Sequence, residues 1–357
     1  MKTGRSIVDL ANELTRQQSS KRDLLVPSRL WHLETTADSS SQVIVEEPTG
    51  AARYGIAELA RRQLAERLKI PFGYFERCRQ EQPALLDRNV NTWLHSEAEG
   101  GEHRMLRTLD GRVRAVLSPR YRRLDNFELA EHVLPMLREL PQVRFESLEL
   151  TETRMYLKVV TPRVQYEVAP GDIVQAGVAI ANSEVGCGTL SVQPLVYRLL
   201  CRNGLIAPER GLRKTHVGRL LDGGDESMEV FKDDTLMADD RAFFLKVRDV
   251  VQAAVSEASF VPVAEKMKAT LGIALKGDPV RTVEVLANRY SLNDDERSRV
   301  LRRLIGDADL TGYGLVNAVT GASQDIADYD RATELEALGG RMIDLNAREW
   351  QELAEAR

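Results

Sequence analysis

The stretch between residues 144 and 160, "RFESLELTETRMYLKVV", decides the fold class. Apolar and polar side chains alternate on both sides of the polar "TET" at 151–153, a pattern typical of two antiparallel strands joined by a tight turn. Two further extended segments follow, "GDIVQAGVAIANSE" at 171–184 and "GTLSVQPLVYRLLC" at 188–201. Few helical stretches separate these segments, which favours a hairpin-linked antiparallel sheet over a doubly wound parallel one.

The flanking sequence completes this prediction. "MLRTLDGRVRAVLS" at 105–118 reads as two short strands around Asp110-Gly111, a dipeptide typical of tight hairpins. Helical patterns dominate both ends of the chain. We therefore predict an α+β protein with a central antiparallel, hairpin-linked β-sheet backed by helices. Its expected parts are a mainly helical N-terminal region at 1–100, a β-rich central domain at 101–221 and a helical C-terminal region at 222–357.

Composition and missing motifs exclude several classes of protein. The only apolar stretch near the N-terminus is interrupted by Asp9 and Glu13, so we expect no secretory signal and a cytoplasmic protein. No window approaches the roughly 20 apolar residues of a membrane span, so no membrane partner is expected. The three cysteines form no CxxC pair, and no H-E-x-x-H or phosphate-binding loop occurs. We therefore expect no enzyme, no cofactor and no bound metal.

Basic residues gather in two segments of this acidic chain, whose net charge is -5. Residues 104–123 hold seven arginines against one aspartate, a local charge of +6. Residues 198–219 hold five arginines and one lysine against one glutamate, a local charge of +5. Both segments belong to the predicted sheet, and the guanidinium group of arginine suits bidentate contacts with phosphate. The pattern predicts a phosphate-binding face.

Strand geometry suggests how that face is built. Alternate residues of a strand share a face, which places Arg112 beside Arg114 and Arg120 beside Arg122. Tyrosines next to the arginines could stack unpaired bases. The predicted nucleic-acid contacts are Arg107, Arg112, Arg114, Arg120, Tyr121, Arg122, Arg123, Tyr197, Arg198, Arg202, Asn203, Arg213, Lys214 and His216. We expect single-stranded nucleic acid and further copies of this chain as partners.

Three alternatives stay open. The segment "LDGGDESMEVFKDDTLMADD" at 221–240 holds eight acidic residues and one lysine, and it could neutralise the basic face within the molecule or in a neighbouring subunit. The protein would then be a self-assembling ring or filament. The helices at 55–80 resemble a helix-turn-helix but also fit two simply packed helices. Acidic pairs such as Asp294-Asp295 could bind Mg²⁺ in a nuclease, although their positions favour helix capping.

The segment from residue 171 to 206 resembles the central motif of the phage/plasmid-like family with domain of unknown function 932. The motif comprises Gly171-Asp172, Asn182-Ser183 with Gly186, and Arg198 through Cys201 to Asn203. Leucines stand at 199 and 200, where the family has valines. The resemblance implies turn and structural roles for Gly171, Asp172, Asn182, Ser183 and Gly186. It also implies a protein of a mobile element, with fold-level similarity to single-strand annealing proteins that act in recombination or replication.

Overall fold

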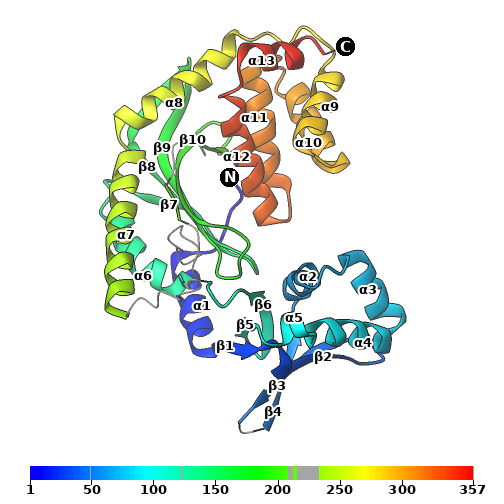
Figure 1. Ribbon diagram of the computed structural model, residues 1–357. Helices are drawn as coiled ribbons and strands as arrows, with labels where there is room; N and C mark the ends of the chain where they lie inside the picture. Colours follow the sequence, from blue (N-terminus) through cyan, green and yellow to red (C-terminus); the bar gives the residue numbers. More distant parts are fainter. Residues whose placement is uncertain (49, 122–123, 208–211, 215–232, 357) are drawn as a thin grey trace, which may run out of the picture.

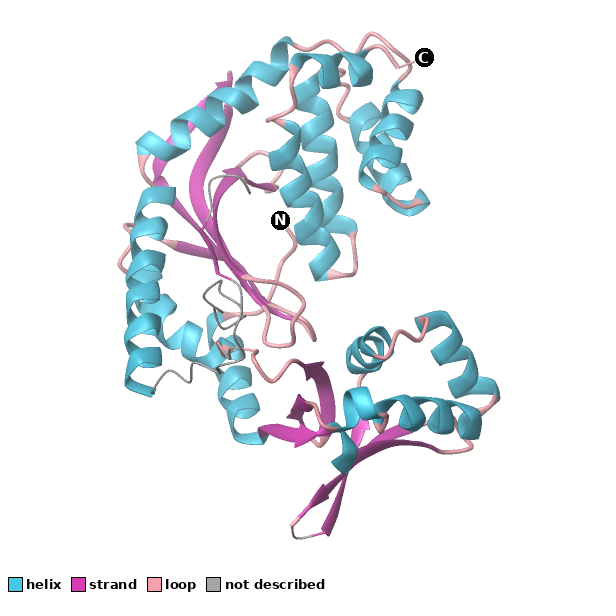
Figure 2. Ribbon diagram, viewed as in Figure 1, coloured by secondary structure: helices cyan, strands magenta, loops and turns pink. Residues whose placement is uncertain are grey.

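Two β-sheets and the helices packed on them make up the molecule (Figure 1). The computed structural model describes residues 1–48, 50–121, 124–207, 212–214 and 233–356. Figure 2 shows the two sheets as separate layers, each with helices against it. The chain starts with α1 (Ile7–Ser20), which packs on the second sheet, and then enters the first.

The first sheet has the strand order β1-β5-β6-β4-β3-β2. Its strands are β1 (Lys21–Pro27), β2 (Trp31–Thr35), β3 (Ser41–Glu47), β4 (Gly50–Ile56), β5 (His103–Leu109) and β6 (Arg112–Leu117). All neighbours are antiparallel except β4 and β6, which pair in parallel over Gly55–Arg112 and Ile56–Val113. Asp110 and Gly111 adopt φ angles of 52° and 71°, so the predicted β5–β6 hairpin is confirmed.

Helices cover one face of this first sheet. They are α2 (Glu58–Arg67), α3 (Phe72–Glu81), α4 (Pro83–Leu94) and the short α5 (Glu97–Gly100). Trp31, Phe75 and Leu106 are fully buried in the core between helices and sheet. Because β5 and β6 pair with β1 and β4, the predicted boundary between the N-terminal region and the central domain, at residues 100 and 101, runs through this sheet. The N-terminal region contributes four strands, β1 to β4, where a mainly helical region was predicted.

The second sheet is the hairpin-linked antiparallel sheet that the alternation predicts, in the order β11-β10-β9-β8-β7. Its strands are β7 (Arg144–Leu150), β8 (Met155–Ala169), β9 (Asp172–Asn182), β10 (Leu190–Arg198) and β11 (Gly204–Ile206), with β12 (Leu212–Lys214) also paired to β10. Even-numbered residues of β9, such as Val174 and Val178, are buried on one face, whereas Ala179 is buried on the other. Both faces are therefore covered.

The helices that follow β6 lie around this sheet or against one another (Figure 1). They are α6 (Asn126–Arg138), α7 (Asp233–Ala254), α8 (Glu257–Ala269), α9 (Pro279–Tyr290), α10 (Asp294–Gly306), α11 (Gly312–Ala322), α12 (Tyr329–Met342) and α13 (Ala347–Ala354). Helices α6, α7 and α8 pack on one face, and α12 packs on the other and against β11. The predicted α+β class, with a central antiparallel sheet and a helical C-terminal part, is confirmed.

Candidate nucleic-acid interface

Arg107 lies in a buried group of charges where the two sheets meet. Its Nε donates to Asp23 at 2.8 Å, its Nη2 to Asp125 at 2.6 Å and its Nη1 to the carbonyl of Glu184 at 2.8 Å. All three guanidinium nitrogens are thus engaged, and the residue is only 3% exposed. The expectation that Arg107 contacts phosphate is therefore corrected: its charge is neutralised by the protein's own carboxylates.

Glu184 connects this group to the second sheet. Its carboxylate accepts from the backbone N–H of Asn126 at 2.6 Å, from Lys21 at 3.3 Å and from Arg114 at 3.1 Å. Lys21 also pairs with Asp125 at 2.7 Å. We call the six side chains the junction cluster: Lys21, Asp23, Arg107, Arg114, Asp125 and Glu184. Three cations face three carboxylates, so the cluster carries no net positive charge, and Arg114 is also unavailable as a free phosphate contact.

The electrostatics of Asp125 show how the cluster holds its charges. Burial alone would raise the pKa of this carboxyl group, but the positive charges of Arg107 and Lys21 outweigh burial and lower the pKa below its ordinary value. The ionised form is therefore stabilised in the folded protein. The connection from Ser118 to Asp125, which joins β6 to α6, is anchored through this carboxylate.

The predicted Asn-Ser-x-x-Gly turn, 182–186, packs against the same connection. The hydroxyl of Tyr121 donates to the carbonyl of Ser183 at 2.9 Å, and burial raises the pKa of this tyrosine. Asn182 donates to the carbonyl of Leu124 at 3.0 Å. Gly186 has a φ of +79°, and a Cβ there would lie 2.7 Å from the side chain of Leu117. The turn therefore helps to hold the two sheets together. Tyr121 is fixed by its hydrogen bond and is not free to stack on a base.

Arg198, the first residue of the second basic segment, lies away from the junction cluster. Arg198 donates to both carboxylate oxygens of Asp172, at 2.9 Å from Nε and 2.7 Å from Nη2, and Tyr313 donates to the same carboxylate at 2.6 Å. Arg198 stands at the far end of β10 from the 183–188 turn, about 27 Å away at about 3.4 Å per residue. The expected convergence of the two arginine segments is therefore wrong for Arg198. The backbone of Arg213 and Lys214 lies opposite Ser191 and Leu190, at the end of β10 next to the turn.

Two other predicted contacts are also inside the protein. Tyr197 is 5% exposed and packs with Leu195 and Ile206, so it offers no stacking surface. Asn203 is buried and donates to Asn317 at 3.2 Å and to Thr320 at 2.6 Å, which joins β11 to α11. Gly171, with a φ of +79°, forms the turn between β8 and β9, and its amide donates to Glu167 at 2.8 Å.

Three predicted contacts remain exposed: Arg112 at the start of β6, Arg120 after its end, and Arg202 after β10. Within the described part of the chain, none of their guanidinium groups has a carboxylate partner. Arg122, Arg123, His216 and the acidic segment up to residue 232 lie outside the described residues. Arg213 and Lys214 belong to β12, where only the backbone is described. Arg112, Arg120 and Arg202 are therefore the described side chains that can contact a phosphate.

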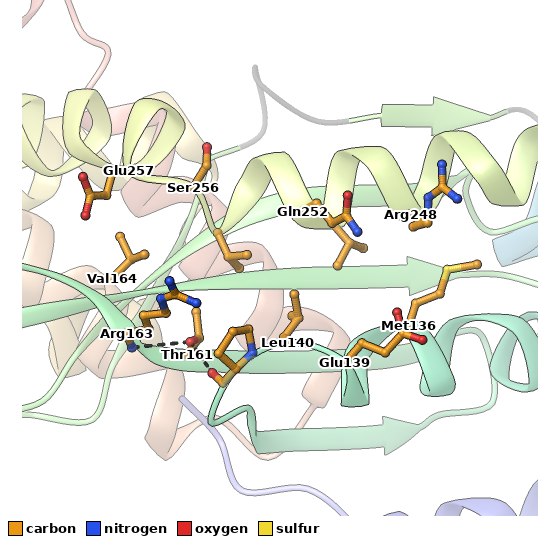
Figure 3. A pocket seen from close by; sticks show the side chains of 13 residues that line it. Met136, Glu139, Leu140, Thr161, Arg163, Val164, Arg248, Gln252, Ser256 and Glu257 are labelled. Carbon is orange, nitrogen blue, oxygen red and sulfur yellow. Dashed lines mark hydrogen bonds between the residues drawn. The ribbon is translucent and has the colours of Figure 1, made fainter.

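A cavity of about 400 Å³ opens on the outer side of the second sheet (Figure 3). It lies between the end of α6, strand β8 and the break between α7 and α8, and Leu140, Val164 and Val251 are among its apolar lining residues. Arg163 reaches toward it from an irregularity in β8, where the pairing with β9 skips from Thr161 to Gln165. Arg248, Glu139 and Glu257 also line the cavity, so two cations face two carboxylates and its charge favours neither anion nor cation.

The remaining chemistry is sparse among the described residues. No group of three or more His, Cys, Asp or Glu side chains there is arranged to hold a metal ion. None of the helices found there is both long and apolar enough to cross a membrane. Asp294 and Asp295 lie in the first turn of α10, where Asn293 and Glu296 form a capping box.

Sequence reasoning missed the acidic partners Asp23, Asp125 and Glu184. In the sequence, these three residues are marked only as carboxylates within or beside a short apolar segment, which does not identify them as partners of the arginines. In comparisons with known proteins, no family model, curated protein or solved structure matches this chain. The resemblance to the phage/plasmid-like family therefore stays a prediction.

Proposed function

We propose that this chain binds single-stranded nucleic acid without catalysing a reaction, and that it serves strand annealing in the recombination or replication of a phage, plasmid or integrative element. The sequence resemblance supports the mobile-element context. The exposed arginines support the ligand. Arg112, Arg120 and Arg202 are the described members of the predicted set that are free to meet phosphate.

The observation that carries the proposal is the position of Arg120. It is exposed, whereas its neighbour Tyr121 is bound to Ser183 and the connection ends at Asp125 in the junction cluster. An arginine on a connection anchored at both sides loses less conformational freedom on binding than one on a loose loop. The sequence continues with Arg122 and Arg123, which extends the basic character of this connection.

The salt dependence of binding tests this proposal. Each phosphate neutralised on a single strand contributes about -0.7 to the slope of log K against log salt. Two contacts from Arg112 and Arg120 give a slope of about -1.4, and any further phosphate contact, such as one at Arg202, steepens it by about 0.7. Substituting Arg112→Gln and Arg120→Gln together is expected to make the slope shallower by about 1.4.

The measurement is the anisotropy of a labelled oligothymidylate titrated at several salt concentrations. Arg302→Gln is the matched control, because Arg302 is an exposed arginine of α10 outside the proposed surface. The proposal fails if the oligomer shows no binding at low salt. It also fails if the double substitution changes the slope no more than the control does.

A further inference from the structure

The exposed aromatic side chains of this protein are not the predicted ones. Tyr121 is anchored and Tyr197 is buried, as described above. In the described part of the chain, the aromatic residues with large exposed areas are Trp93 (56% exposed) and Tyr74 (43%). They lie on α4 and α3, the helices that cover the first sheet. Large exposed aromatic rings are costly to leave in water, so their shared location needs a reason.

Asn89 brings these side chains together into one surface. Helix α3 packs on α4. The side chain of Cys78 raises the pKa of the Tyr74 hydroxyl, and the side chain of Asn89 lies close enough to oppose this rise. Leu85, Asn89 and Trp93 follow one another at intervals of four residues, so they line one face of α4. Leu85 is 37% exposed. We call Tyr74, Leu85, Asn89 and Trp93 the α3–α4 face.

Packing does not explain this face. The opposite side of α4 supplies Leu86, Val90 and Leu94 to the core between the helices and the first sheet, and all three are at most 1% exposed. Asn91 ties α4 to the backbone of β2, accepting from the N–H of Leu33 and donating to its carbonyl, both at 2.8 Å. Helix α4 is therefore fixed without any contribution from Trp93.

We propose that the α3–α4 face binds unpaired nucleobases, which stack on Trp93 and Tyr74. This inference rests on the proposed function and names a binding site within it. Aromatic rings accept any base by its π-face, and the Asn89 amide adds a donor and an acceptor for a base edge. Arg88, exposed on the same helix and without a carboxylate partner among the described residues, is placed to meet the backbone phosphate.

The extent of the face favours bases over a protein partner. A stable protein interface covers about 800 Å² on each partner and has an apolar centre with a polar rim. Here three apolar side chains are interrupted by Asn89 and bordered by Arg88 and by the exposed Arg77–Glu81 ion pair at 2.9 Å. Rings interleaved with amide and guanidinium groups instead match the alternation of bases and phosphates along a single strand.

The site is separate from the proposed phosphate contact at Arg112. Tyr54, Ile56 and Val113 face the helices of the first sheet. Arg112 alternates with Val113 and lies against Gly55, so its side chain is on the opposite face of the sheet.

Tryptophan fluorescence gives a direct test. The other two tryptophans, Trp31 and Trp350, are 1% and 5% exposed, so a stacked base quenches the emission of Trp93 selectively. We expect oligothymidylate to quench this emission, and an oligomer of abasic sites with the same phosphates to bind without quenching. Trp93→Ala is expected to weaken oligothymidylate binding by at least about fivefold, the lower range for one stacked base, and Trp93→Phe by less.

Anisotropy of the labelled oligomer, measured on the same samples, separates the two proposals. Binding without a change in Trp93 emission, or equal binding by Trp93→Ala and the unsubstituted chain, overturns the stacking site and leaves the proposed function standing. Absence of any binding overturns both. Ile305→Ala is the matched control, since Ile305 of α10 is also 56% exposed, and it is expected to leave the affinity unchanged.

Discussion

Replacing Glu184 by glutamine tests whether the junction cluster holds the two sheets together. The side chain of Glu184 is 3% exposed and accepts from Lys21, Arg114 and the backbone of Asn126. Glu184→Gln leaves three cations facing two carboxylates. Removing one partner from a fully buried ion pair costs about 3–5 kcal/mol. Because Lys21 and Arg114 keep 11% and 14% of their side-chain surface exposed, solvent relieves part of this cost, and we expect about 2–4 kcal/mol.

Two assays report this loss. Urea unfolding followed by circular dichroism gives the change in free energy of unfolding, and trypsin cleavage after Arg120 reports how firmly the connection between Ser118 and Asp125 is held. We expect Glu184→Gln to lower the unfolding midpoint and to speed this cleavage. Adding Arg114→Gln restores equal numbers of cations and carboxylates and is expected to recover at least half of the lost stability.

The exposed Glu46 provides a control for the loss of a carboxylate. Glu46→Gln removes an exposed carboxylate of β3 and is expected to change stability by less than about 0.5 kcal/mol. A similarly small effect of Glu184→Gln, with unchanged cleavage after Arg120, refutes the view that this cluster locks the sheets. Failure of Arg114→Gln to compensate shows that the loss comes from the weaker hydrogen bond that an uncharged amide oxygen accepts from Asn126, and not from charge imbalance.

Two further predictions concern buried charge. Lys158, 1% exposed on β8, donates to Glu336 of α12 at 2.8 Å. Lys158→Met leaves a buried carboxylate without its partner, so we expect urea unfolding to show a loss of about 3–5 kcal/mol, most of which Glu336→Leu should recover in the double variant. A single variant as stable as the unsubstituted chain contradicts the role of this buried pair. The pKa values of Asp125 and Glu296 are lowered in the folded protein, so their contribution to stability is complete above the unfolded pKa of about 4 and is lost as the pH falls below it. Urea midpoints measured from pH 6 to pH 3 should therefore decrease, and a rise on acidification contradicts this.

The second sheet and the β5–β6 hairpin of the first sheet were predictable because their signals are local. Strands β7 and β8 alternate apolar and polar residues around a short turn, and β5 and β6 meet at Asp110-Gly111, so each pairing partner is close in sequence. Strand β1 was missed for the opposite reason. "KRDLLVP" has no clean alternation, and it becomes a strand by pairing with β5, with Lys21 opposite Leu109. Tertiary pairing overrides such a weak local pattern.

The candidate site was predictable only in part for the same reason. Asp23 stands directly opposite Arg107 in the β1–β5 ladder, and Glu184 reaches the cluster from a turn 77 residues further along the chain. A count of charges within 20 residues contains neither carboxylate. Arg112 and Arg120 are exposed, as the predicted phosphate contact requires. The sequence alone did not separate them from Arg107 and Arg198, which have the same residue type and similar neighbours.

Strand position supplies the missing criterion. From Arg104 to Thr108, β5 is buried on both faces, so its arginines had to be neutralised: Arg104 pairs with Glu99 and Arg107 with Asp23 and Asp125. Arg112 and Arg120 flank β6 at its turn and at its exit, where a side chain can reach water without a partner. A strand end alone is not sufficient, because Arg198 ends β10 but is buried and paired with Asp172. The arginines available to a ligand are those that are exposed and have no carboxylate partner among the described residues. The salt slope of binding should accordingly follow Arg112 and Arg120 and be insensitive to the total of +6.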